Sequence, residues 1–150
     1  MSINEAVGRT SSPTATGTTY DLVLRGQQVL TAQGIGPREI GVRDGKIVAV
    51  QELGAGLAAE RVIEVASDEV LLPGLVDTHV HVNEPGRTEW EGFESATKAA
   101  AAGGVTTIVD MPLNSIPPTV NLEALEIKRA AASKNAYVNV GFWGGALPGN

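Results

Sequence analysis

Hydrophobic and polar positions follow two different patterns along the chain, and the change from one to the other falls near residue 71. Between residues 20 and 70, short runs alternate between apolar and polar side chains, which is typical of β-strands; the clearest are residues 20–25, 28–31, 40–43, 46–50 and 61–65. Asp44-Gly45 separates two of these runs and is a strong signal for a two-residue hairpin turn. We therefore predict a small β-sandwich portion at residues 20–70, with a structural role.

Residues 71–150 alternate between strand-like apolar runs and helical patterns, which is typical of a parallel α/β fold. Strands are expected at residues 75–81, 105–110 and 136–143, and helices at residues 88–103 and 122–134. Thr88 and Glu91 match a capping box that would begin the first helix. The second helix would be capped by Asn121 or Thr119.

Composition and charge narrow the class of protein. The chain carries a formal charge of −6, from 11 Lys and Arg against 17 Asp and Glu, so it lacks the basic surface of a nucleic-acid-binding protein. It has no cysteine, which excludes disulfides, thiolate metal sites and a cysteine nucleophile. No apolar stretch approaches the roughly 20 residues of a membrane span. Residues 1–19, rich in Ser, Thr and Gly, are predicted to be a disordered tail without a signal pattern, and we expect a cytoplasmic protein.

His79 and His81 are the only histidines, and they lie two residues apart near the end of an apolar run. In a strand such residues point to the same face, so their imidazoles would stand side by side. Two neutral imidazoles on one face supply half of a transition-metal site, for which zinc is the default ion. The alternative is a pair of half-exposed strand histidines with hydrogen-bond partners. Their position before a Gly/Pro-bearing loop favours the metal site, because active sites of parallel α/β barrels lie at the carboxyl ends of the strands.

Three further side chains bear on this site or on the core beside it. Asp77 shares the strand face of the histidines and could orient one of them by accepting its second ring N–H; the alternative is an aspartate that pairs with backbone amides. Trp90 and Phe93 are at helical spacing, which predicts that both are buried in the core.

The segments PGLVDTHVH (residues 73–81) and NEPGRTEWEGFESATKAAAAGGVTTIVDMPLNSIPPT (residues 83–119) resemble the cyclic amidohydrolases of the amidohydrolase superfamily. The resemblance implies a TIM-type (β/α)8 barrel, of which residues 71–150 would supply about three strands and two helices. A complete barrel needs eight such units and about 250 residues. We therefore expect the N-terminal portion of a longer enzyme, and expect these 150 residues alone to be inactive.

The resemblance also assigns roles to individual residues. It implies that His79 and His81 bind metal, with two Zn2+ per full-length subunit, and that the remaining ligands and the general base lie beyond Asn150. It places Asn83, Arg87 and Asn114 at the substrate. The dihydroorotase relatives carry an arginine at the position of Asn83, so a neutral amide there favours a neutral ring over a carboxylate-bearing one. Alternatives are a loop salt bridge for Arg87 and a turn role for Asn114.

The function that this resemblance implies is metal-dependent hydrolysis of a ring C–N amide in a small cyclic ureide. A homo-oligomer, a tetramer in the resembled family, is expected. Within the class, dihydroorotases and the hydantoinase/dihydropyrimidinase group are the alternatives. From another class, the alternative is a non-catalytic barrel relative that serves as a scaffold protein.

Overall fold

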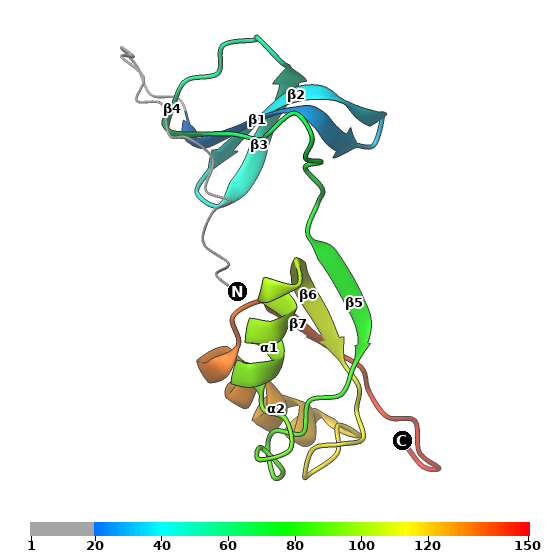
Figure 1. Ribbon diagram of the computed structural model, residues 1–150. Coiled ribbons are helices and arrows are strands. Elements are labelled where there is room, and N and C mark those ends of the chain that lie inside the picture. The colour runs from blue at the N-terminus through cyan, green and yellow to red at the C-terminus, as the bar shows by residue number, and fades with distance from the viewer. Residues whose placement is uncertain (1–19) are drawn as a thin grey trace. The chain divides into compact units, whose positions relative to one another are not determined.

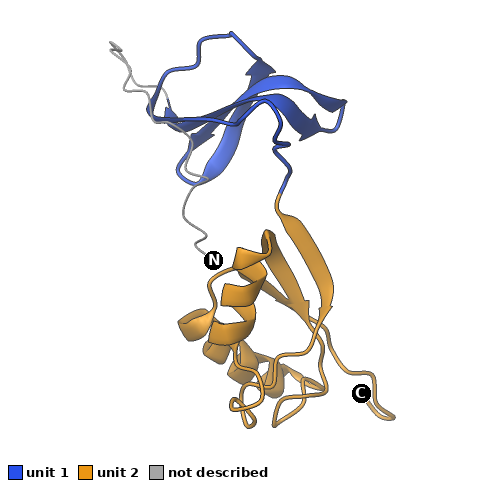
Figure 2. Ribbon diagram, viewed as in Figure 1, with its two compact units in different colours: residues 1–73 blue, residues 74–150 orange. Residues whose placement is uncertain are grey.

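The computed structural model describes residues 20–150, so the disordered tail predicted for residues 1–19 lies outside the described residues. The chain divides into two compact units between Pro73 and Gly74 (Figure 2). The sequence pattern placed the change a few residues earlier, near residue 71.

The described part of the first unit is one mixed sheet in the order β3-β2-β1-β4 (Figure 1). Its strands are β1 (Tyr20–Thr31), β2 (Gly34–Arg43), β3 (Lys46–Glu52) and β4 (Ala59–Glu64). β2 is antiparallel to β1 and β3, whereas β4 runs parallel to β1. Residues 20–73 form a single sheet. The second layer of the expected β-sandwich therefore remains a prediction.

The turn between β2 and β3 is the hairpin that Asp44-Gly45 predicts. Asp44 has φ of 51° and Gly45 has φ of 70°, both in the left-handed region. A two-residue turn of this kind needs positive φ at both positions, which aspartate tolerates and glycine adopts at no steric cost. The hairpin prediction is confirmed.

Glu39, a charged residue on β2, is only 2 % exposed. Its carboxylate accepts the backbone N–H groups of Gly54 (3.0 Å) and Leu57 (2.8 Å) and lies 3.3 Å from Nε of Arg25. Burial alone would raise the pKa of Glu39, but these hydrogen bonds and the Arg25 charge outweigh it and hold the pKa below its ordinary value of 4.5. This carboxylate therefore fixes the loop between β3 and β4.

We expect Glu39→Gln to lower the free energy of unfolding at pH 7 by about 1.5–3 kcal/mol, the range for hydrogen bonds to a charged group. Because folding lowers the pKa of Glu39, its contribution is complete above pH 4.5. It is lost as the pH falls through the still lower pKa of the folded state. Urea unfolding of both proteins should therefore give curves that differ at pH 7 and approach one another as the pH is lowered through the pKa of folded Glu39. Glu52→Gln, at a carboxylate that is 76 % exposed, is the matched control. A difference that persisted in acid would contradict the assignment.

The second unit is a three-stranded parallel sheet, in the order β5-β6-β7, with two helices. In chain order its elements are β5 (Leu75–Val80), α1 (Phe93–Ala102), β6 (Val105–Asp110), α2 (Leu122–Asn135) and β7 (Asn139–Phe142). Both helices pack on one face of the sheet (Figure 1) around a core of Val82, Phe93, Ile108 and Ala132. The expected three strands and two helices are present; residues 74–150 do not themselves show a closed barrel.

The two helices begin differently from one another, and one prediction was wrong. Helix α1 has Gly92 as its N-cap with no side-chain cap bond, so the predicted capping box from Thr88 does not form. Instead, Oε2 of Glu84, eight residues before the N-cap, accepts the N–H of Phe93 at 2.9 Å. Helix α2 begins as expected, with Asn121 Oδ1 accepting the N–H of Ala124 at 2.9 Å.

The two aromatic residues at helical spacing have opposite surroundings. Phe93 is fully buried and makes an edge-on contact with Phe142, with ring centroids 6.4 Å apart. Trp90 lies before the helix and is 67 % exposed, so its predicted place in the core was wrong. The reason is the late start of α1, which takes Trp90 off the helical periodicity.

Among residues 20–150, no helix combines the length and the apolar character needed to cross a bilayer.

Candidate functional site

The two histidines stand together on the sheet face opposite the helices. Val80 and Val82 pack into the core beneath α1 and α2, so the alternating residues His79 and His81 point the other way. Their Nε2 atoms are 3.3 Å apart and their ring centroids 5.3 Å apart. This is the side-by-side arrangement that strand geometry predicts for the pair.

The same two rings have the donor set and spacing that a metal ion requires. Two nitrogen ligands at about 2.0–2.1 Å from one tetrahedral ion are separated from each other by about 3.3 Å. Nδ1 of His81 lies 2.9 Å from Oδ1 of Asn114. The amide oxygen can only accept, so this contact is a hydrogen bond in the tautomer of His81 that carries its proton on Nδ1, and this tautomer leaves the lone pair on Nε2. The residues present therefore fit a divalent cation, with Nε2 of each histidine as ligand.

His79 and His81 are the two candidate metal ligands in the part of the chain that the structure describes. Within residues 20–150, no group of three or more His, Cys, Asp or Glu side chains lies close enough to hold a metal ion. A catalytic zinc site usually takes three protein ligands and a water. The histidine pair is thus a partial site.

Asn114 and Asp77 make contacts that differ from their expected roles. Asn114 follows β6 and supports the ring of His81, so it orients a candidate ligand; its contact with substrate remains a prediction. Asp77 Oδ1 accepts the backbone N–H of His79 at 3.0 Å. This contact corresponds to the alternative role, in which the aspartate pairs with a backbone amide. Asn114, from the loop after β6, makes the ring contact that was one of the two roles considered for Asp77.

Asn83 and Arg87 lie in the loop after β5. Asn83 is only 7 % exposed; its backbone N–H donates to Glu91 O and its backbone oxygen accepts from Arg87 N–H. Its side-chain Oδ1 is buried without a hydrogen-bond partner in the described part of the chain. The guanidinium of Arg87 lies over the ring of Trp90, 5.0 Å from its centroid. The substrate contacts of Asn83 and Arg87 remain predictions.

The loops that follow β5 and β6 are joined directly. Ile116 N–H donates to Pro85 O at 2.8 Å. Gly86 has φ of 96°, and a Cβ at this position would lie 2.6 Å from Cβ of Ile116. Only glycine allows this approach without displacement. The contact brings the segment that carries Asn114 next to the segment that follows His81.

A buried charged pair lies beneath the histidines, and the sequence analysis did not find it. Asp110, the last residue of β6, and Lys128, on α2, are both fully buried, with Nζ 2.5 Å from Oδ2. Burial raises the pKa of Asp110, against the opposing hydrogen bonds from Lys128 and the Val82 N–H. A signal was available, because an aspartate that ends a strand of otherwise apolar and threonine residues needs a partner.

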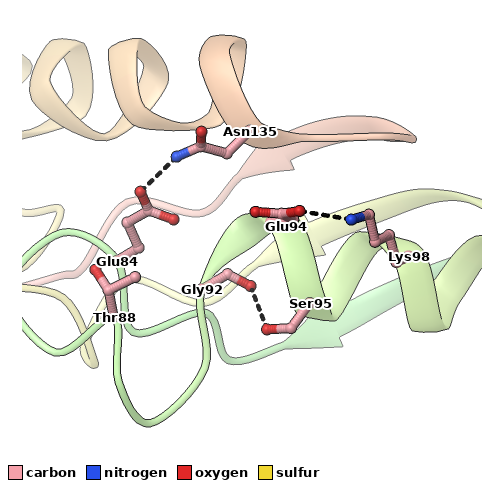
Figure 3. Close-up of a pocket in the computed structure, with 7 residues that line it drawn as sticks. All are labelled: Glu84, Thr88, Gly92, Glu94, Ser95, Lys98 and Asn135. Carbon is pink, nitrogen blue, oxygen red and sulfur yellow. Dashed lines mark hydrogen bonds and ion pairs between the residues drawn. The ribbon is translucent and has the colours of Figure 1, made fainter.

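The structure also contains a pocket of about 360 Å³ on the helical side of this unit (Figure 3). Glu84 extends between the N-terminus of α1 and Asn135, whose amide donates to its Oε1 at 2.7 Å. Lys98 pairs with Glu94 at the rim. None of the predicted site residues lines this pocket, and the carboxylates labelled in it are engaged with the protein. It is therefore a groove between structural elements, distinct from the histidine site.

Comparison with known proteins gives the family. The model of the amidohydrolase family matches residues 70–149, which is more than half of the chain. Two relatives are the allantoinase of Streptomyces avermitilis, 58 % identical over 130 residues, and the mitochondrial allantoinase of Aquarana catesbeiana, 48 % identical over 128 residues. The aligned regions cover 87 % and 85 % of this chain, respectively. They cover only 29 % and 26 % of the length of these two relatives.

A solved structure supports the same assignment. The L-hydantoinase from Arthrobacter aurescens superposes with a TM-score of 0.78 at 32 % identity, over 87 % of this chain and 29 % of that protein. Similarity to allantoinases over most of the chain confirms the resemblance found in the sequence. The match over residues 70–149 shows that the chain belongs to the amidohydrolase family.

Proposed function

We propose that the full-length protein is an allantoinase, which hydrolyses a ring C–N amide of allantoin to give allantoate. The observation that carries the proposal is the histidine pair, His79 and His81, with Nε2 atoms 3.3 Å apart at the carboxyl end of β5. The similarity to allantoinases, at 58 % and 48 % identity over 130 and 128 residues, supports the choice of substrate.

In this proposal His79 and His81 hold a divalent cation, zinc by preference for nitrogen ligands. When bound, such a cation supplies Lewis acidity toward the ring carbonyl. Asn114 holds the His81 proton on Nδ1 and so keeps Nε2 free to bind. The remaining ligands and the general base are assigned to residues beyond Asn150. Two Zn2+ per subunit, a homotetramer and a cytoplasmic location remain predictions from the sequence.

The substrate is proposed to be a neutral ureide because of the residue that follows the metal-binding strand. Asn83 stands where dihydroorotase relatives carry an arginine, and an amide cannot make the bidentate charged contact that a substrate carboxylate favours. Arg87 could partly restore the charge; its guanidinium lies over Trp90, and its contact with a substrate remains a prediction.

A second candidate is ring opening of a hydantoin, favoured by the match to the L-hydantoinase at a TM-score of 0.78. Both candidates use the same histidine pair and differ in the ring that is opened. Dihydroorotase activity and a non-catalytic scaffold role are the remaining alternatives.

The test is hydrolysis by the full-length protein, loaded with zinc, of allantoin, 5-substituted hydantoins and dihydroorotate at equal concentrations. We expect kcat/KM to be highest for allantoin, activity to disappear on chelation, and activity to return on readdition of zinc. Highest kcat/KM for a hydantoin would support the second candidate. Hydrolysis of none of the three rings by metal-loaded protein would contradict both.

A further inference from the structure

The inference concerns the buried pair Asp110 and Lys128, which no proposed step uses. Both side chains are fully buried, and Lys128 reaches the sheet from the middle of α2. A buried ion pair is weak evidence for stability, because two charges lose their hydration and apolar residues of similar volume often serve as well. Such a pair can instead fix the positions of the groups that it contacts, and its hydrogen bonds show which groups these are.

The pair holds both backbone groups of the residue that follows His81. Asp110 Oδ1 accepts the N–H of Val82 at 2.8 Å, and Lys128 Nζ donates to the carbonyl oxygen of Val82 at 3.0 Å. Val82 is itself fully buried. The peptide at the end of the metal-binding strand is thus held from two directions, by β6 and by α2.

Lys128 also reaches the support of the His81 ring. Its Nζ donates to Ser115 Oγ at 3.2 Å. Ser115 follows Asn114, whose Oδ1 accepts from Nδ1 of His81 at 2.9 Å. The Lys128 ammonium group therefore contacts both Val82, which follows His81, and Ser115, which follows Asn114.

Three contacts of the ammonium account for this arrangement. Lys128 forms an ion pair with Asp110 and donates hydrogen bonds to the Val82 carbonyl and to Ser115. A methionine of similar length would fill the same volume and make none of the three contacts. The linkage between the two loops therefore depends on this one charged group.

We propose that Lys128 and Asp110 are positioning residues, which hold Val82 and Ser115 so that Asn114 keeps the His81 proton on Nδ1 and Nε2 available to a cation. The consequence for metal binding rests on the proposed function. The structural claim, that the pair fixes the His81–Asn114 contact, does not.

The experiment uses the metal-free full-length protein with 15N-labelled histidine at mildly alkaline pH. Solid-state 15N spectra separate the Nδ1–H and Nε2–H forms; the His81 signal is the one lost in His81→Gln. In the unsubstituted protein we expect His81 to be the Nδ1–H form. Lys128→Met and the reference Asn114→Ala should both give a mixture. Lys98→Met, which removes an exposed ion pair with Glu94, should leave the signal unchanged.

The same variants are then titrated with Co2+ against a chromophoric chelator. We expect Lys128→Met to weaken Co2+ binding by about 10–100-fold, the effect of losing a partner that orients a ligand. Lys98→Met should bind as the unsubstituted protein does. Because Lys128→Met leaves Asp110 unpaired, the double variant Lys128→Met/Asp110→Asn is measured as well. The asparagine keeps an acceptor for the Val82 N–H and removes the lone charge.

A folded single or double variant with an unchanged His81 signal and unchanged Co2+ affinity would overturn the proposal. If neither variant folds, Ser115→Ala decides: a reduced Nδ1–H fraction supports the linkage through Lys128, and an unchanged fraction overturns it. These spectra need neither metal nor substrate. A protein that shows the expected changes but hydrolyses none of the tested rings would leave this inference standing and refute the proposed function.

Discussion

Replacing His79 or His81 by alanine is expected to lower the affinity of the full-length protein for Zn2+ or Co2+ by more than about 100-fold. Loss of a partner that only orients a metal ligand lowers metal affinity by about 10–100-fold. A direct nitrogen ligand should therefore cost more. Each variant removes one of the two Nε2 atoms that lie 3.3 Å apart. Metal affinity is measured by competition with a chromophoric chelator. Ring hydrolysis should fall in proportion to the loss of bound metal.

The control is Arg129→Gln, on α2, where an exposed ion pair with Glu126 is lost and binding should not change. Thermal unfolding of the metal-free variants separates loss of ligand from loss of structure, because both histidine side chains lie on the exposed face of β5 or just after it. Stoichiometric, tight binding that survived both single substitutions would rule out the histidine pair as the metal site.

The second large effect is expected in the core of the same unit. Phe93→Ala should lower the free energy of unfolding by about 3–5 kcal/mol, the usual cost of removing a buried aromatic ring together with the cavity that remains. Phe93 is fully buried among Val82, Ile108 and Ala132 and contacts Phe142 edge-on. Urea unfolding followed by circular dichroism would measure the loss.

Trp90→Ala is the matched control, because it removes a larger aromatic ring only three positions away. Trp90 is 67 % exposed, and its recorded ring partner is the guanidinium of Arg87. Loss of that contact should cost no more than about 1 kcal/mol. Equal destabilisation by the two substitutions would contradict the difference in burial between the two rings.

Local signals in the sequence were accurate where neighbouring residues alone decide the structure. The bounds of β6 at residues 105–110 match the β-branched run, the cap of α2 is Asn121, and Asp44-Gly45 forms the expected hairpin. Each depends on backbone geometry or on hydrogen bonds that span a few residues. The capping box at Thr88 met the same local criteria and failed. Glu84, brought in by the folded loop, provides the cap instead.

In the candidate site, too, features set by neighbouring residues could be predicted, and contacts between distant residues could not. The spacing of His79 and His81 was enough to predict that both rings share a face, because alternation is a property of any strand. The partner of His81 was not predictable from spacing, since Asn114 lies 33 residues further along the chain. Asp77, the near candidate, makes its recorded hydrogen bond with a backbone amide.

The sequence by itself determined the family resemblance, the parallel αβ order of residues 74–150 and the two imidazoles that could bind a metal. These follow from short-range periodicity and from a motif that can be read without coordinates. Tertiary structure alone decided which side chains support those imidazoles. The contact between the loops at Gly86 and Ile116, and the donors of Lys128 toward Val82 and Ser115, join segments that are distant in sequence. No pattern within one segment specifies such a contact, because its formation depends on the packing of the whole unit.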